Sequence, residues 1–143
     1  MSTAHQALAH RFAEILNGHD AGRFADLIAP NYVNHNPYVE QGQAGVIAFF
    51  SHWLEAFPDT HVTLEDVIAT DDKVVGRYTY RGTHSGNFMG YPPTGTPVCM
   101  RSIDIWRVKD GRFVEHWDEL NTLEVFQQIG AAKIIPPVSA ASS

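Results

Sequence analysis

The first half of the chain repeats its hydrophobic residues at the three-to-four-residue spacing of an amphipathic helix. This spacing predicts a helix over residues 3–17, a short second helix from Asp20 to Pro30 with Asp20 as its N-cap, and a third helix over residues 42–57. Between the second and third helices, residues 31–37 are expected to run as a brief extended piece into a loop.

After Pro58 the pattern changes to runs rich in β-branched and aromatic residues, which are typical of strands. The four runs are residues 61–70, 73–83, 98–109 and 112–120. Asp71-Asp72 and Asp110-Gly111 separate neighbouring runs, at points where tight hairpins need residues that accept a positive φ. Helices followed by four strands predict an α+β fold, with the helices on one face of a curved antiparallel meander and no parallel pairing.

The connection between the second and third strands, residues 82–97, is long for a hairpin. Its glycines and prolines fix turns, yet it also carries Phe88, Met89 and Tyr91, which a fully solvated loop does not need. One interpretation is a lid over a pocket. The other is that these side chains plug the open end of the sheet.

Length and composition fit one globular domain. Of the 143 residues, 44% are hydrophobic and 18% are charged, and no run of apolar residues is long enough to cross a bilayer. We therefore expect a single domain over residues 1–130. Residues 131–143 are small, polar and proline-bearing, and we expect a tail that is loosely held or used in a subunit contact.

Charge and cysteine content narrow the choice of partners and compartment. Ten basic against sixteen acidic residues give a net charge of −6, and no basic patch is present, so nucleic acid is a poor partner. Cys99 is the only cysteine, which excludes an internal disulfide and a cysteine-based zinc site. With no recognisable signal sequence at the N-terminus, these features favour the cytoplasm.

The last two strands place ionisable residues inside otherwise apolar sequence. Asp104 lies between two isoleucines, while His116 and Asp118 share one face of the final strand. A carboxylate kept in a cavity is penalised by desolvation, and its altered proton affinity suits a general acid or base. Asp118 is therefore the leading catalytic candidate, with Asp104 and His116 beside it.

Other interpretations of these residues stay open. Asp104 and Asp118 could satisfy neighbouring groups in a solvated strand end, and His116 could lie on the surface of an edge strand. His35, in the cluster Asn-His-Asn-Pro, either orients a substrate carbonyl or caps a local backbone group. The eight histidines show no metal-binding spacing, so no metal is expected. The sequence also contains no phosphate-binding loop and no nucleophile elbow.

Three segments together resemble the SnoaL-like polyketide cyclase family. They are residues 32–37 (YVNHNP), the string from Gly82-Thr-His-Ser-Gly86 to Pro92-Pro-Thr-Gly95, and residues 110–118 (DGRFVEHWD). The resemblance covers the chain from the first helix to about Gly130. It implies the cone-shaped α+β fold of the nuclear transport factor 2 superfamily, in which a curved sheet and helices enclose a deep pocket.

The resemblance also implies an activity. Cyclases of this family close a ring in a polyketide ester by intramolecular aldol condensation, without metal or organic cofactor, and their acid–base aspartate lies where this chain has Asp118. The family's dimers lead us to expect a homodimer formed through the outer sheet face, acting on a small hydrophobic organic substrate. The expected pocket wall consists of Tyr32, Phe49, Trp53, Phe88, Met89 and Met100.

One position departs from the family. Asp104 stands where the family often has a histidine, and a second carboxylate beside Asp118 is similar to the paired aspartates of limonene epoxide hydrolases. Arg101 could supply a cation, but strand alternation places it on the opposite face from Asp104. An epoxide hydrolase and a non-catalytic ligand-binding protein therefore remain alternatives to the cyclase.

Overall fold

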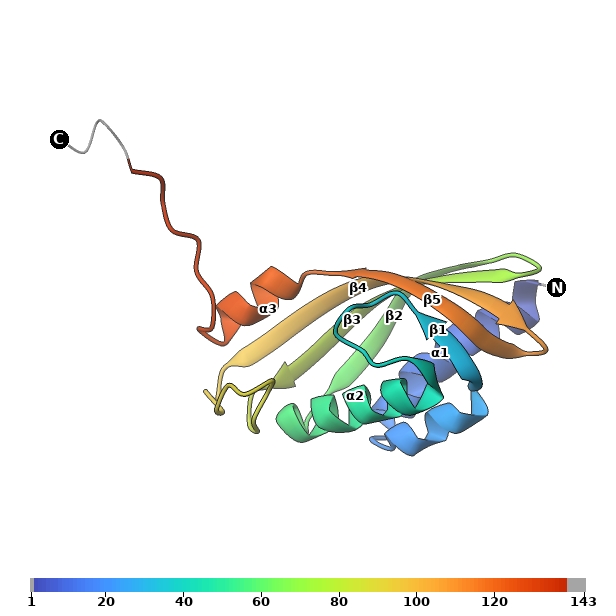
Figure 1. Ribbon diagram of the computed structural model, residues 1–143, viewed down its shortest axis with the longest axis horizontal. Coiled ribbons are helices and arrows are strands. Elements are labelled where there is room, and N and C mark those ends of the chain that lie inside the picture. The colour runs from blue at the N-terminus through green and yellow to red at the C-terminus, as the bar shows by residue number, and fades with distance from the viewer. Residues whose placement is uncertain (1, 139–143) are drawn as a thin grey trace.

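A computed structural model describes residues 2–138 as a curved five-stranded sheet with helices packed on its concave face (Figure 1). The elements in chain order are α1 (Ser2–Asn17), the 3-10 helix η1 (Ala21–Asp26), β1 (Ile28–Asn34), α2 (Gly42–Ala56), β2 (His61–Ala69), β3 (Lys73–Thr83), β4 (Pro97–Lys109), β5 (Arg112–Leu120) and α3 (Thr122–Gln128). The predicted α+β class and the helix-covered curved sheet are confirmed. No helix among these residues is long and apolar enough to span a membrane.

The strand order is β1-β5-β4-β3-β2, and β1 pairs with β5 in parallel. Two expectations were therefore wrong: Ile28 begins a strand instead of ending a helix, and the sheet is not purely antiparallel. β1 is hard to recognise because Pro30 interrupts its alternation, and its pairing with β5 is irregular between Ile28 and Val33. Proline is tolerated there because β1 is an edge strand.

The turns of the two tight hairpins differ in backbone conformation. Asp110 and Gly111 have φ values of 53° and 74°, as expected for the turn between β4 and β5. Neither Asp71 nor Asp72 adopts a positive φ, which corrects the expectation for the turn between β2 and β3. That turn is closed by the Thr70 N–H, which donates to the Lys73 carbonyl at 2.8 Å.

Aromatic side chains hold the helices on the sheet. The ring of Phe12 on α1 lies 5.3 Å from Tyr78 and 5.0 Å from Trp106, centroid to centroid. The buried Tyr78 hydroxyl donates to the Ala9 carbonyl at 2.7 Å, which fixes α1 against β3. Asp20 caps η1 as predicted, since its side chain accepts from the Gly22 N–H.

The loop between β3 and β4 combines both interpretations considered for it. Phe88 is buried against Trp53, Phe57 and Phe126, so it plugs the end of the sheet. Met89 is 41% exposed and lies at the rim of a hollow. The loop therefore closes the core and borders the opening at once.

The sequence analysis missed α3, which follows β5 directly. After it the chain carries no regular element up to residue 138, where Ile134, Ile135 and Val138 are exposed (Figure 1). The remainder of the expected tail, residues 139–143, lies outside the described residues. The boundary at residue 130 remains a prediction.

Candidate active site

Two adjoining hollows lie between α2 and the concave face of the sheet. The inner one has an empty volume of about 440 Å³ and contains the side chains of Asp104, His116 and Asp118. The outer one, about 400 Å³, is bordered by Phe88, Met89 and residues of α3. Both share the same four wall residues, Asn36, Phe49, Met100 and Leu120. The outer hollow at the rim and the inner hollow with the polar cluster are thus neighbours with a mostly apolar common wall.

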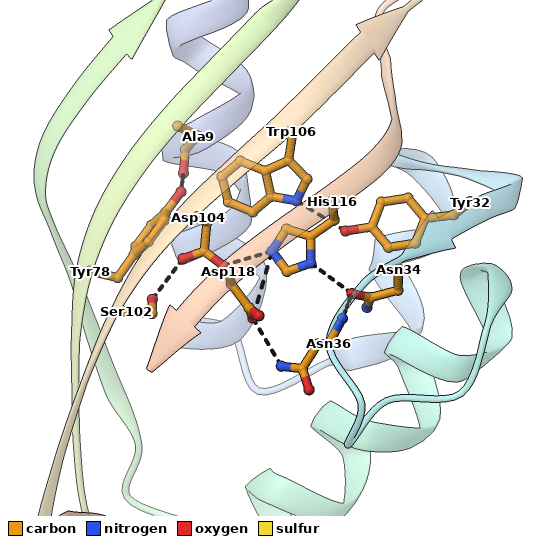
Figure 2. A network of polar contacts seen from close by, with 10 residues as sticks. All are labelled: Ala9, Tyr32, Asn34, Asn36, Tyr78, Ser102, Asp104, Trp106, His116 and Asp118. Atoms are coloured by element: carbon orange, nitrogen blue, oxygen red, sulfur yellow. Dashed lines mark hydrogen bonds and ion pairs between the residues drawn. The ribbon is translucent and has the colours of Figure 1, made fainter. Parts of the chain in front are cut away.

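The pairing of β4 with β5 brings the three predicted ionisable residues together. Asp104 is the register partner of Asp118, and His116 is that of Trp106. Alternation along β5 then turns His116 and Asp118 to the same face. The Nε2 atom of His116 lies 2.7 Å from Oδ1 of Asp104 and 3.8 Å from Oδ2 of Asp118 (Figure 2).

Asp104 has both carboxylate oxygens bonded. Its Oδ1 atom faces His116, and its Oδ2 atom accepts from the Ser102 hydroxyl at 2.6 Å. The residue is 3% exposed. The basic partner of this carboxylate is His116 and not Arg101, which faces outward and pairs with Glu124 at 2.7 Å.

Asp118 has one oxygen held, and the other has no hydrogen-bond partner among the described residues. Its Oδ2 atom accepts from the side-chain amide of Asn36 at 3.0 Å, and its side chain is 8% exposed. Burial raises the pKa of Asp118, and Asp104 adds to the rise, while His116 and the Asn36 hydrogen bond oppose it. The result is a carboxylate with more affinity for a proton than an ordinary aspartate.

β1 supplies the polar wall opposite β5. Tyr32, Asn34 and Asn36 point into the hollow, as Figure 2 shows, because strand alternation continues past the end of β1. The same alternation turns His35 outward, where its Nε2 atom lies 2.9 Å from Glu115 and its ring stacks on Trp117. His35 therefore does not reach the site, contrary to expectation.

Asn34, Asn36 and Ser102 are the site residues that sequence reasoning missed. Asn34 accepts from Nδ1 of His116 at 3.0 Å, and the other two hold the carboxylates. A signal for the asparagines was present, since residues 32, 34 and 36 alternate like a strand, but residues 31–37 were expected only as a brief extended piece entering a loop, with no place in the sheet.

The residues expected to line the pocket lie along the two hollows. Tyr32 borders the inner one, Phe49 and Met100 border both, and the outer one is lined by Trp53, Phe88 and Met89. Tyr80 also lines the inner hollow and was not anticipated.

Two phenols face the carboxylates. Burial raises the pKa of Tyr32 and of Tyr80 well above the usual value, and the charge of Asp104 raises both further. Both therefore stay neutral. The Tyr32 hydroxyl accepts from the Trp106 indole N–H at 3.1 Å, so its own proton remains to be donated.

The three ionisable side chains are close enough to raise the question of a metal ion. One ligand atom from each of Asp104, His116 and Asp118 lies within 4.8 Å of the others. However, the nitrogen of His116 that faces the carboxylates is 2.7 Å from Asp104, which is the distance of a direct charge-assisted hydrogen bond. We therefore interpret the cluster as a hydrogen-bonded acid–base group.

Fold and site together define a class: a small α+β cone with a curved open sheet, whose hollow holds a cluster of two aspartates and a histidine. The family model of the SnoaL-like polyketide cyclase matches residues 6–129, and the chain belongs to this family.

Known proteins similar to this chain include an enzyme and two solved structures. Aklanonic acid methyl ester cyclase DauD of Streptomyces sp. (strain C5) is 27% identical over 130 residues, which cover 86% of this chain and 80% of DauD. The structure of TsrD from Streptomyces laurentii has a TM-score of 0.83 at 33% identity, covering 91% of this chain and 97% of TsrD. AclR of Streptomyces galilaeus, a proposed hydroxylase, has a TM-score of 0.84 at 29% identity, covering 100% of this chain and 95% of AclR.

Proposed function

We propose that this protein is a cofactor-independent cyclase that closes a ring in a polyketide-like ester by intramolecular aldol condensation, with Asp118 as the acid–base residue. The observation that carries the proposal is the placement of Asp118 in a mostly apolar hollow, 8% exposed, with one oxygen held by Asn36. The raised pKa of Asp118 makes it a stronger base than a solvated aspartate.

The proposed reaction conserves all atoms of the substrate. Asp118 takes a proton from a carbon next to a carbonyl, and the resulting enolate carbon forms a bond to a second carbonyl carbon of the same molecule. The oxygen of that second carbonyl becomes a hydroxyl when the proton is returned. The product is an isomer of the substrate, so no oxidant, reductant or water is consumed.

The hollow supports this chemistry by positioning. The wall residues Phe49, Trp53, Phe88 and Met100 are apolar, which suits a small hydrophobic substrate and excludes water around Asp118. Holding two reacting carbons in contact can supply several kcal/mol of the barrier, roughly 7 or more in favourable cases. The neutral Tyr32 hydroxyl is available to stabilise a developing oxyanion, whereas both ring nitrogens of His116 are already bonded, to Asn34 and Asp104.

The test uses aklanonic acid methyl ester, the compound in the name of DauD, as the first probe. Wild-type protein is expected to convert it to a product of equal mass, followed by chromatography and mass spectrometry. Asp118→Asn is expected to lower turnover by about 10³-fold, because the amide cannot accept the proton. Asp71→Asn, which removes one exposed carboxylate in the β2–β3 turn, is the matched control.

Two results would contradict the proposal. Retained turnover in Asp118→Asn would remove this residue from the chemistry. A probe or related polyketide ester that binds to the wild-type protein and is recovered unchanged in every case would instead support the ligand-binding alternative.

The second candidate, an epoxide hydrolase, rests on one observation: Asp104 and Asp118 face each other across His116. Both oxygens of Asp104 have hydrogen-bond partners, however, so of these two aspartates only Asp118 keeps an oxygen that can act on a substrate. Reaction in water labelled with heavy oxygen separates the two functions. A hydrolase places the label in a diol, whereas the cyclase product carries none.

We also propose a homodimer formed through the convex face of the sheet. Ile103 and Ile105 are exposed there on β4, and Ile68 is exposed on β2. A second copy would cover this apolar surface. Light scattering after size exclusion is expected to give twice the chain mass for the wild-type protein and the mass of a single chain for Ile103→Asp. A wild-type monomer would refute the proposal.

A further inference from the structure

Two asparagines at alternate positions, Asn34 at the end of β1 and Asn36 just past it, have their side-chain amides oriented by the backbone. The Asn34 Oδ1 atom accepts from the backbone N–H of Asn36 at 3.0 Å, and the Asn36 Oδ1 atom accepts from the backbone N–H of Tyr38 at 2.8 Å. A backbone N–H is always a donor, so each bond identifies the amide oxygen and, with it, the amide nitrogen. The donor and acceptor ends of both amides are therefore determined.

The orientation of Asn34 determines the proton on His116. Because Oδ1 of Asn34 can only accept, Nδ1 of His116, 3.0 Å away, must carry a hydrogen. On the other side of the ring, Nε2 lies 2.7 Å from Oδ1 of Asp104. A second proton is shared between those two atoms, so neither nitrogen offers a free lone pair to a substrate.

The orientation of Asn36 has the complementary effect on Asp118. Its amide nitrogen donates to Oδ2 at 3.0 Å, so that oxygen is an acceptor, and the remaining Oδ1 is left for the substrate. The amide thus favours the ionised carboxylate, while His116 offers protons only.

Both asparagines are held in place by their surroundings. They are 5% and 7% exposed, respectively. Gln41 also clamps the backbone of Asn34, since its Oε1 atom accepts from the Asn34 N–H at 2.9 Å and its Nε2 atom donates to the Asn34 carbonyl at 2.7 Å. Turning either amide over would leave buried polar groups without partners, which costs about 1–3 kcal/mol each.

We propose that Asn34 and Asn36 are positioning residues that fix the protonation of the site. Asn34 keeps a proton on Nδ1 of His116 wherever the protein is folded, so the ring acts only as a donor, and Asn36 keeps Asp118 as the only base. The proposal rests on the proposed function only in calling Asp118 the base. The other titratable groups facing the ring are Asp104 and the phenols of Tyr32 and Tyr80.

The first experiment measures the His116 nitrogens directly. In protein labelled with nitrogen-15 at histidine, long-range proton–nitrogen correlations report whether each ring nitrogen carries a hydrogen, and His116→Gln identifies the signal by its loss. We expect Nδ1 of His116 to be protonated throughout the range from about pH 5 to pH 9, in which an ordinary histidine loses one proton. A bare Nδ1 anywhere in that range overturns the proposal, and this result needs no variant of Asn34.

Variants of Asn34 sharpen the assignment. Asn34→Leu removes the acceptor, so the neutral ring is expected to carry its hydrogen on Nε2 and leave Nδ1 bare at high pH. Asn34→Asp keeps an acceptor and is expected to restore the protonated Nδ1. Asn31→Leu, at an exposed position of β1, is the matched control. An Nδ1 that stays protonated in Asn34→Leu contradicts the role of Asn34.

The second experiment concerns Asn36 and follows the carboxyl carbon of Asp118 by carbon-13 titration. Asn36→Leu removes a hydrogen bond to the ionised form, so the midpoint is expected to move to higher pH, while Asn31→Leu leaves it in place. An unchanged midpoint refutes the role of Asn36. With a substrate that the wild-type protein converts, Asn36→Leu is expected to lower kcat by roughly 10- to 100-fold, as loss of a hydrogen-bonding partner of a site residue typically does. Failure of the cyclase proposal would leave both spectroscopic results intact.

Discussion

Asp104 and Asp118 are register partners on neighbouring strands, yet the two sides of the site that they form differ. On the closed side, Asp104 is buried and has both oxygens bonded, to Ser102 and His116. On the open side, Asp118 borders the inner hollow and has one oxygen bonded, to Asn36. The same residue type thus has both oxygens bonded on one side and one oxygen open to the hollow on the other.

The comparison shows that the two aspartates differ in how many hydrogen-bond partners their carboxylates have, and not in burial alone. A carboxylate with all partners in place stabilises the fold around it, and a carboxylate that lacks one retains affinity for a proton. If this view is correct, changing the two residues to asparagine should have different consequences for stability and turnover.

The largest effect on stability is expected on the closed side. Asp104→Asn removes the buried carboxylate that is bonded to both His116 and Ser102, and we expect the free energy of unfolding to fall by about 3 kcal/mol. Urea unfolding at pH 7 measures it, with Asp71→Asn as the control for removal of an exposed carboxylate. A loss well under 1 kcal/mol would mean that the closed side does not hold the sheet together.

The next largest effect is the dependence of turnover on pH. Because burial raises the pKa of Asp118 above 3.8, the ionised base is lost as the pH falls through that raised value. Turnover is then expected to decline about tenfold per pH unit on the acidic limb. A profile of kcat/KM against pH checks this, and an acidic limb centred at or below 3.8 would contradict it.

A smaller effect of opposite sign is expected for the stability of Asp118→Asn. A raised pKa means that the folded state disfavours the ionised form, so wild-type Asp118 costs stability above that pKa and costs none well below 3.8. Asparagine removes this cost. We expect a gain of about 1 kcal/mol at pH 7 that shrinks toward acidic pH, measured by thermal unfolding at several pH values. A loss of stability at pH 7 would be inconsistent with this account.

The smallest effect is expected at the rim of the open side. Met89 is 41% exposed and lines the outer hollow, so Met89→Ala should weaken substrate and transition-state binding alike. We expect KM to rise about threefold with kcat unchanged, which corresponds to the loss of roughly one buried methylene. Leu123→Ala, at an exposed position of α3 that lines neither hollow, is the control, and a fall in kcat at Met89 would place this residue nearer to the chemistry.

Much of the fold could be predicted from the sequence because the signals are local. Alternation and β-branched residues located β2 to β5, and helical spacing located α1 and α2. Of β1, only an extended piece over residues 31–37 was predicted; its place in the sheet was missed because its pairing is made with a segment far along the chain, which no local window contains. The helix α3 is short, with seven residues, and too short for its spacing to be recognised.

The candidate site was predictable to a similar degree. Asp104, His116 and Asp118 could be grouped because a hairpin aligns them, and hairpin register follows from the turn. His35 was placed wrongly because the face of a strand depends on recognising the strand, and an error of one position exchanges inside for outside. Recognising β1 would have directed attention to Asn34 and Asn36 instead.

The parallel pairing of β1 with β5 also has a consequence for how the chain matures. Asn34 and His116 are separated by 82 positions, so the first half of the site is synthesised long before the second half emerges. Until then β1 has no strand to pair with, since β5 is its partner in the sheet. Contacts of such long range slow folding because the chain between them must close into a loop first. A nascent chain that ends before β5 would therefore lack His116 and Asp118 and would expose the unpaired edges of β1 and β4.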